Sequence, residues 1–458
     1  MVVLLAGVLS FAVACGDEDN PATVNNSTAN NSTANNSTAN NSTANNSTTN
    51  NSTANNSTTN NSTTNNSTEN NGHNNTHNNN NPDVEIAAAT DAAELHAALT
   101  ALLQEHVYLA AIATSTAIAA GGDLADESVV AAVTTLDENS VAIAGAVGSV
   151  YGADAEAAFL SAWRGHIGFF VNYTLGVATD DDAMKQGALA DLEGYAVSSG
   201  QFFEDATGGR LPATAVKASF EHHIATFTQA IDAQVAGEAT QFGLVAAAAH
   251  HMPSVATALA VAITDQFSID GHVSSGGSGL RAALTALLQE HAYLAGITTG
   301  TAIAAGGDME DPLVLAAAGA LDENSVAIAA AVGSVYGTEA QAAFLSAWRG
   351  HIGFFVEYTL GKATNDDARV DAALANLGGY AVSSSQFFST ATEGRLEAVA
   401  LQTEVETHIG TLAAAVDAQL AGETSQFGLL ATAAKHMPHL AAALAIAIND
   451  QFPETFQN

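Results

Sequence analysis

Residues 102–110 read LLQEHVYLA, and residues 287–295 repeat this stretch as LLQEHAYLA. The same offset relates LDENSVAIAGAVGSVYG at 136–152 to LDENSVAIAAAVGSVYG at 321–337. The correspondence extends without a gap from 95–267 to 280–452. Solenoid repeats recur every ~20 to 50 residues, so a period this long indicates duplication of a whole domain.

Each repeat is predicted to be helical. Alanine is abundant, apolar residues recur at steps of three and four, and alternating β-branched runs do not occur. Glycine, proline and acidic positions divide the first repeat into six predicted helices, at 92–120, 125–150, 153–176, 181–206, 212–236 and 238–265. We therefore predict an all-α fold of two tandem six-helix bundles, at 83–267 and 280–458.

The segment between the repeats, 268–279, reads SIDGHVSSGGSG. Gly and Ser are typical of flexible linkers, so we expect the two bundles to be loosely coupled. The earlier segment 16–82 consists largely of Asn, Ser and Thr. A tract with so few apolar residues cannot bury enough surface to offset its ordering entropy, and we expect a disordered tether there.

The N-terminus indicates export. Residues 2–14 form an apolar run that is too short to span a bilayer, and the small residues Ala12 and Ala14 precede Cys15, the only cysteine of the chain. This arrangement resembles the signal of a bacterial lipoprotein. The resemblance implies a signal at 1–15, a lipid on Cys15, and a membrane-anchored location in the periplasm or at the cell surface. An ordinary cleaved signal remains the alternative.

The formal charge is −37, with 47 acidic and 10 basic residues. Nucleic-acid binding relies on clusters of Lys and Arg, which the chain does not provide, so nucleic acid is excluded as an expected partner. The acidic positions fall mostly between apolar ones, which indicates a solvated, self-repelling surface rather than an acidic ligand-binding face. The sequence identifies no protein partner.

Four histidines of each repeat lie on the predicted apolar stripe of their helices. In the first helix, for example, Leu99, Leu102, His106 and Leu109 follow one another at steps of three and four. The full set is His106, His166, His223 and His251 in the first repeat and His291, His351, His408 and His436 in the second. An imidazole in a helical core needs a polar partner, so these residues predict a buried polar site.

Histidines beside the stripe differ between the repeats. His222 corresponds to Thr407 and His250 to Lys435, whereas the on-stripe His223 persists in a stretch that has otherwise diverged. We therefore expect the off-stripe histidines to carry no special role.

Neutral imidazole is the commonest protein ligand for copper and zinc, and helical bundles build metal sites from inward side chains. The eight on-stripe histidines are thus candidate metal ligands. Met252 and Met437 would add a soft thioether and favour copper. Carboxylates shared by both repeats would orient the rings, namely Glu105, Asp137, Glu221 and Asp232 with Glu290, Asp322, Glu406 and Asp417.

Two other interpretations remain open. The histidines could form a hydrogen-bonded network with core groups such as Tyr108 and Tyr195 in a non-catalytic structural or interaction module, or they could line a pocket for a small ligand or haem. An enzyme is the least favoured class. The spacings of di-iron, zincin, P-loop and triad sites do not occur, so no catalytic residue is assigned. Glu105 and Glu221 are the only acid–base candidates.

The segments EHVYLA at 105–110, SVYG at 149–152, FLSAWRGHIGFF at 159–170 and HM at 251–252 occur in this order in the chain. Together they resemble a group of bacterial secreted or membrane-attached helical proteins with no established activity. The resemblance implies the six-helix unit and the positions of its histidines, and nothing about a substrate.

Overall fold

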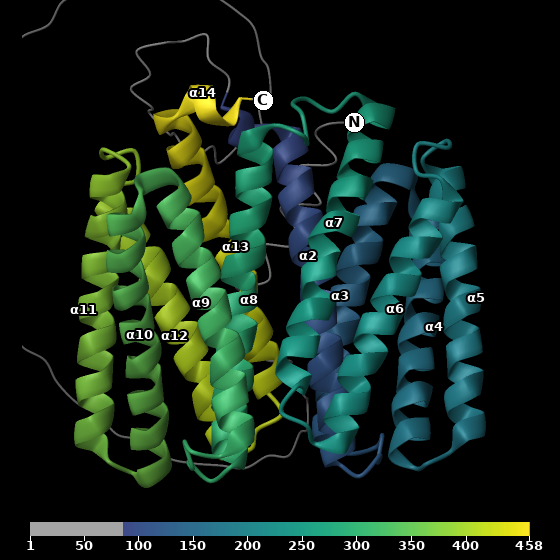
Figure 1. Ribbon diagram of the computed structural model, residues 1–458, viewed down its shortest axis with the longest axis horizontal. Helices are drawn as coiled ribbons and strands as arrows, with labels where there is room; N and C mark the ends of the chain where they lie inside the picture. Colours follow the sequence, from purple (N-terminus) through teal and green to yellow (C-terminus); the bar gives the residue numbers. More distant parts are fainter. Residues whose placement is uncertain (1–85, 458) are drawn as a thin grey trace, which may run out of the picture. The chain divides into compact units, whose positions relative to one another are not determined.

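The computed structural model describes residues 86–457, which belong to one compact unit (Figure 1). This part of the chain is entirely helical. The all-α prediction is therefore confirmed for it. The predicted signal at 1–15 with Cys15, and the predicted tether at 16–82, lie outside the described residues.

The helices follow the predicted ones closely, with each boundary in the first repeat displaced by at most three residues. The first repeat forms the 3₁₀ helix η1 (Ala87–Ala89) and α2 (Asp91–Ala119), α3 (Glu127–Tyr151), α4 (Ala153–Ala178), α5 (Asp182–Ala206), α6 (Ala213–Ala236) and α7 (Gln241–Phe267). The second forms α8 (Gly276–Ala304), α9 (Pro312–Tyr336), α10 (Thr338–Thr364), α11 (Asp367–Ala391), α12 (Ala398–Ala421), α13 (Gln426–Gln451) and α14 (Pro453–Phe456).

Capping residues set these ends. The Asp126 side chain accepts hydrogen bonds from the backbone amides of Ser128 and Val129, and Asp311 does the same at the corresponding helix of the second repeat. Gly237 ends α6 in the left-handed conformation at φ 65°, where a glycine avoids the strain of a Cβ atom. Both kinds of signal could be read from the sequence.

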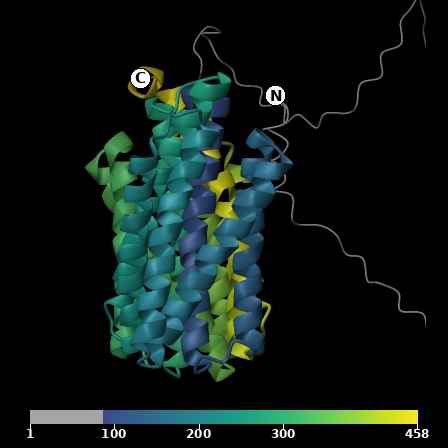
Figure 2. The ribbon, with the colours of Figure 1, turned by 90° about the vertical axis from the view of Figure 1, so that its right-hand side faces the viewer.

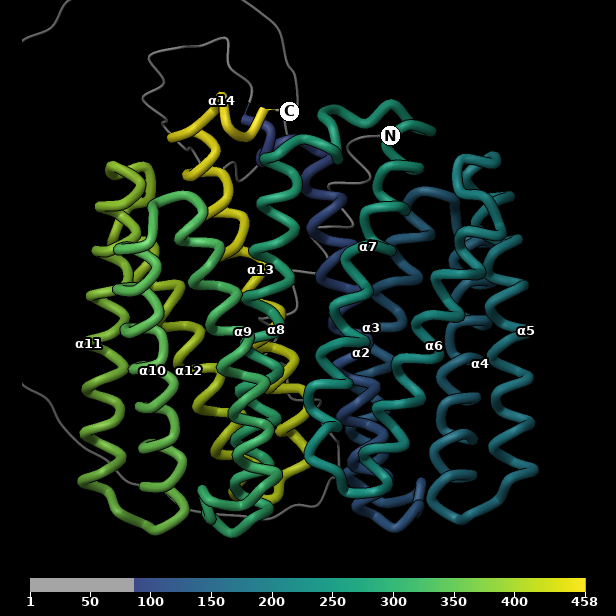
Figure 3. Tube along the Cα trace, viewed as in Figure 1, coloured from purple at the N-terminus to yellow at the C-terminus, as the bar shows by residue number. Residues whose placement is uncertain are grey.

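Within each repeat, consecutive helices pack as neighbours, and α7 returns to α2 while α13 returns to α8. Helices α2 and α8 also pack extensively on each other, so they lie at the centre, with α5 and α11 at the two outer edges (Figure 3). The helices run alongside one another in both ribbon views (Figures 1 and 2). One hydrophobic core contains residues of both repeats, such as Leu103 and Leu288. The division into two tandem bundles that fold separately stays a prediction.

The junction between the repeats is ordered rather than flexible. Helix α8 already begins at Gly276, and Ile269 and Val273 are buried. The prediction of a flexible linker at 268–279 is therefore wrong. At least one glycine of this segment is needed for close packing rather than for flexibility. A Cβ atom on Gly277 would lie 2.3 Å from Asn449 Oδ1 and 2.6 Å from the backbone nitrogen of Ala88.

Four of the described helices are long and apolar enough to cross a membrane: α2, α7, α9 and α13. In α2 the most apolar stretch is 83% buried within the protein, so its composition fits a helix packed on all sides. The corresponding stretches of the other three are 33 to 50% buried.

The packing at Gly277 predicts that Gly277→Ala destabilises the protein by about 1 to 3 kcal/mol, the usual cost of overpacking a well-filled site. Gly279 is the matched control, since it lies in the same helix with nothing within 4 Å of an added Cβ. Gly279→Ala should be neutral or stabilising, because alanine loses less backbone entropy in a helix. Urea unfolding measures both. Equal effects would contradict the close packing of this junction.

Candidate functional site

A pair of buried histidines lies in the core of each repeat. Helix α2 supplies His106 and α4 supplies His166, and their Nε2 atoms are 3.3 Å apart. In the second repeat, α8 and α10 bring His291 and His351 to the same distance of 3.3 Å. All four residues are at most 3% exposed. The apolar stripes predicted from the sequence therefore do turn these imidazoles inward, where they form hydrogen-bonded pairs.

A third on-stripe histidine lies next to each pair. The ring centre of His223, from α6, is 6.4 Å from that of His106, and His408, from α12, is 6.0 Å from His291. Aromatic side chains hold the rings of the first repeat. Trp163 packs against His106 at 4.7 Å, and Tyr195 stacks on His166 at 4.7 Å. The second repeat has the corresponding contacts.

The burial of these imidazoles keeps them neutral. It lowers the pKa of His166 to about 3 and that of His223 to about 4, and neighbouring imidazoles lower both further. The pKa of His106 also lies well below 6.5 for the same two reasons. In a neutral pair, one Nε2–H donates to the other Nε2. Among the described residues, His106 Nδ1 and His223 Nδ1 have no hydrogen-bond partner.

The backbone carbonyl of Trp163 raises the pKa of His166, but burial lowers this pKa by more. No bond of normal hydrogen-bond geometry joins His166 Nδ1 to a described residue. The three imidazoles of each repeat thus form a histidine cluster, His106, His166 and His223 in the first and His291, His351 and His408 in the second. Each cluster has neutral nitrogen atoms in apolar surroundings.

The fourth on-stripe histidine of each repeat has other partners. His251 Nε2 lies 3.1 Å from the carbonyl oxygen of Ser219, and its ring packs on His222 at 4.5 Å. His436 Nε2 lies 3.0 Å from the carbonyl oxygen of Glu404. The expectation of four inward imidazoles is thus not met at His251 or at its counterpart His436, which are only partly buried. The next residue, Met252, takes the inward position instead, because one residue turns a helix by about 100°.

The eight carboxylates predicted to orient the imidazole rings contact other residues. Glu105 contacts Asn139 and Tyr293; Asp137 contacts Arg164; Glu221 contacts Lys217; and Asp232 contacts Tyr173. Glu290 contacts His250; Asp322 contacts Arg349; Glu406 contacts Gln402; and Asp417 contacts Tyr358 and Lys362. The structure gives none of them a hydrogen bond to an on-stripe histidine, so they do not orient those rings.

Residues 86–457 contain no group of three or more His, Cys, Asp and Glu side chains placed to hold a metal ion. Met252 and Met437, the candidate thioether ligands, are both buried. What the structure brings together in each repeat is thus a hydrogen-bonded histidine pair with a third imidazole nearby.

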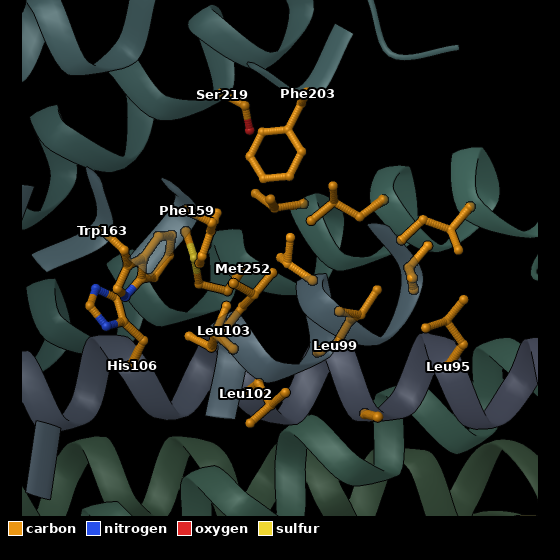
Figure 4. Close-up of a pocket in the computed structure, with 18 of the residues that line it drawn as sticks. Leu95, Leu99, Leu102, Leu103, His106, Phe159, Trp163, Phe203, Ser219 and Met252 are labelled. Carbon is orange, nitrogen blue, oxygen red and sulfur yellow. The ribbon is translucent and has the colours of Figure 1, made fainter. Parts of the chain in front are cut away.

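Apolar cavities flank the first cluster. One of about 70 Å³ is lined by His106, His166 and His223 together with Trp163 and Met252, as the close-up in Figure 4 shows for several of these residues. A second cavity of about 40 Å³ touches His106 and His223 and is lined mainly by aliphatic and aromatic residues such as Phe170. The imidazoles therefore lie between two apolar spaces.

Sequence reasoning missed a second buried polar site, where α2 packs on α8. Glu105 is 2% exposed, and its carboxylate accepts hydrogen bonds from Tyr293 Oη at 2.8 Å and Asn139 Nδ2 at 3.0 Å. Burial raises the pKa of Glu105, although the positive charge of Lys435 opposes this. Tyr293 stacks on Tyr108 with ring centres 5.3 Å apart. The partner of a buried acid in one repeat thus comes from the other repeat.

The mirrored site holds a histidine. Both carboxylate oxygens of Glu290 lie 2.9 Å from Nε2 of His250, and Glu290 is 2% exposed. Tyr108 faces this carboxylate. Burial raises the pKa of Tyr108 most, and the charge of Glu290 raises it further, but the contact between the two side chains lacks normal hydrogen-bond geometry. The expectation that His250 has no special role is wrong. The available signal was its counterpart Lys435, since both side chains can carry a positive charge.

No protein-family model, curated protein or solved structure matches the chain. The resemblance to secreted helical proteins stays a prediction. The chemistry of the site therefore has to follow from its geometry, which offers neutral nitrogen donors in an apolar setting.

The His250–Glu290 contact predicts a pH effect on stability. The hydrogen bond that His250 donates to the Glu290 carboxylate raises the pKa of His250 above 6.5, burial opposes this shift, and the charges of Glu290 and Glu323 add to it. A raised pKa in the folded state means that this contact stabilises fully below pH 6.5 and loses its effect as the pH rises through the folded value. His250→Lys copies the second repeat and keeps the charge. It should therefore be more stable than the parent above that pKa, by up to about 1 kcal/mol, because the His250 side chain is 57% exposed and solvent screens the pair.

Urea unfolding between acidic and mildly alkaline pH measures this difference. The informative quantity is the difference in unfolding free energy between parent and variant. The buried imidazoles with lowered pKa values make both proteins more stable as the pH rises, so their effect cancels in this difference. Exposed His272 is the matched control, and adding His272→Gln to both proteins should leave the difference between parent and His250→Lys unchanged. A His250→Lys curve that runs parallel to the parent at all pH values would refute the ion pair.

Proposed function

We propose that the protein is a membrane-tethered, extracytoplasmic lipoprotein in which each repeat binds or stores one copper or zinc ion. The location rests on the apolar run before Cys15. The metal site rests on one observation, that two buried Nε2 atoms face each other at 3.3 Å in both repeats. No catalytic role is part of the proposal.

This distance suits two ligands of one ion. Zinc lies about 2.0 to 2.1 Å from histidine nitrogen, so two nitrogens of a tetrahedral site are about 3.3 Å apart. The ion would lie between His106 and His166, and between His291 and His351. A modest rotation of the third imidazole, His223 or His408, would add a ligand, and the Nε2 and Nδ1 atoms of His408 have no partner among the described residues.

The surroundings favour copper in its monovalent state. The ligands are neutral and the cavity beside them is apolar, so the charge of the ion would be buried without a compensating carboxylate. A single charge costs less to bury than a double one. Met252 lines the same cavity, and thioethers bind Cu(I) better than they bind zinc.

The alternative is a non-catalytic module in which the pairs only hold the core together. The same 3.3 Å is compatible with a weak hydrogen bond between neutral rings, and the absence of a three-ligand group in residues 86–457 favours this interpretation. The two functions differ in one measurable quantity, the uptake of metal.

Metal titration of protein prepared in chelator tests the proposal. The parent should bind about one Cu(I) per repeat, and His106→Leu with His166→Leu should remove uptake by the first repeat only. His222→Thr, which copies the second repeat, is the matched control and should bind like the parent. Since the pKa of His166 is about 3, protons should compete weakly, and binding should persist at pH 5. No uptake by the folded parent would leave the structural alternative.

A further inference from the structure

The larger cavity of the first repeat is elongated. Its wall follows α2 from Leu95 through Leu99 and Leu102 to His106, and Figure 4 shows these side chains in sequence along the helix. Residues of α7, among them Leu259 and Ile263, form part of another wall. Leu95 and His106 are eleven residues apart, which corresponds to about 16 Å of helix.

The cavity is also narrow. A volume of about 70 Å³ distributed over this length leaves room for little more than a single file of methylene groups. A planar ring system such as a sterol or a porphyrin is wider than that. An unfilled space of this kind forfeits dispersion contacts along its whole lining, and protein interiors contain few such spaces.

The chemistry of the lining differs along its length. No Asp, Glu, Lys or Arg lines the cavity, and most of the lining is aliphatic or aromatic. Besides the imidazoles, three hydroxyl groups line the cavity, and each already has a partner: Ser219 lies 3.0 Å from Nε2 of His251, Ser149 donates to the carbonyl of Ala146, and Tyr151 donates to Gln266. His223 is 6% exposed, and its Nδ1 has no hydrogen-bond partner among the described residues. Because these imidazoles are neutral, they favour a neutral polar group over a carboxylate.

We propose that the first repeat binds one unbranched alkyl chain with a neutral polar end, such as a long-chain alcohol. The chain lies along α2, and the hydroxyl meets His223 and Ser219. The occupant fills the cavity rather than the space between His106 and His166, so its binding does not depend on a metal ion. The second repeat has Glu404 in place of Ser219, and a carboxylate there suits this ligand less well.

The two tryptophans of the chain report on the two repeats separately. Trp163 lines the cavity, and Trp348 occupies the corresponding place in the second repeat. In Trp348→Phe, a decanol brominated at the carbon next to its hydroxyl group should quench Trp163 fluorescence saturably, with one molecule bound per chain, because Trp163 lies at the histidine end of the cavity. In Trp163→Phe, quenching of Trp348 should be at least tenfold weaker at the same concentration. A brominated sterol should not quench Trp163.

Filling the cavity provides the decisive variant. Ala98 and Ala146 both line it, so Ala98→Leu with Ala146→Leu, made in Trp348→Phe, should abolish saturable quenching while the helical circular dichroism is kept. The corresponding pair in the second repeat, Ala283→Leu with Ala331→Leu, is the matched control and should leave it intact. Saturable quenching that survives the filled cavity, quenching by the sterol, or no quenching of Trp163 by the alcohol would each overturn the proposal.

Discussion

The packing of α2 on α8 imposes the constraint on which the rest of the structure depends. Two glutamates, Glu105 and Glu290, lie in this contact at 2% exposure each. A buried carboxylate is costly unless hydrogen bonds or a cation satisfy it. Tyr293 and His250 do so, and each belongs to the repeat that does not contain its glutamate. Two copies of one sequence thus stabilise each other through polar contacts as well as through a shared apolar core.

The histidine clusters depend on this arrangement through α2 and α8. Glu105 and His106 are adjacent, so the same turn of α2 directs a carboxylate to the other repeat and an imidazole into its own. The two residues also differ in electrostatics: burial raises the pKa of Glu105 and lowers that of His106, and both effects favour the neutral form. A change in how the repeats pack would therefore move one imidazole of each histidine pair.

Sequence periodicity was sufficient for the helices and for the inward direction of His106 and His166, because the apolar stripe fixes which side of a helix is buried. Periodicity does not fix how deep a side chain lies or which neighbour it meets, so His251 was misplaced. The contact between the repeats escaped prediction for another reason. Helix α2 is buried on nearly all sides, and such a helix has no single stripe from which one packing face can be read. The glycines of 268–279 are typical of a flexible linker. Closely packed backbone also requires glycine, so composition alone does not distinguish the two cases.

The most direct test of this account is whether the two repeats unfold together. Trp348→Phe leaves Trp163 as a reporter of the first repeat, and Trp163→Phe leaves Trp348 as a reporter of the second. Urea unfolding followed by tryptophan fluorescence in each variant, with circular dichroism as a second probe, gives one midpoint for each repeat. If the buried glutamates couple the repeats, the two midpoints coincide with each other and with the loss of helix. Two separate midpoints, with one repeat folded while the other is unfolded, would contradict the account.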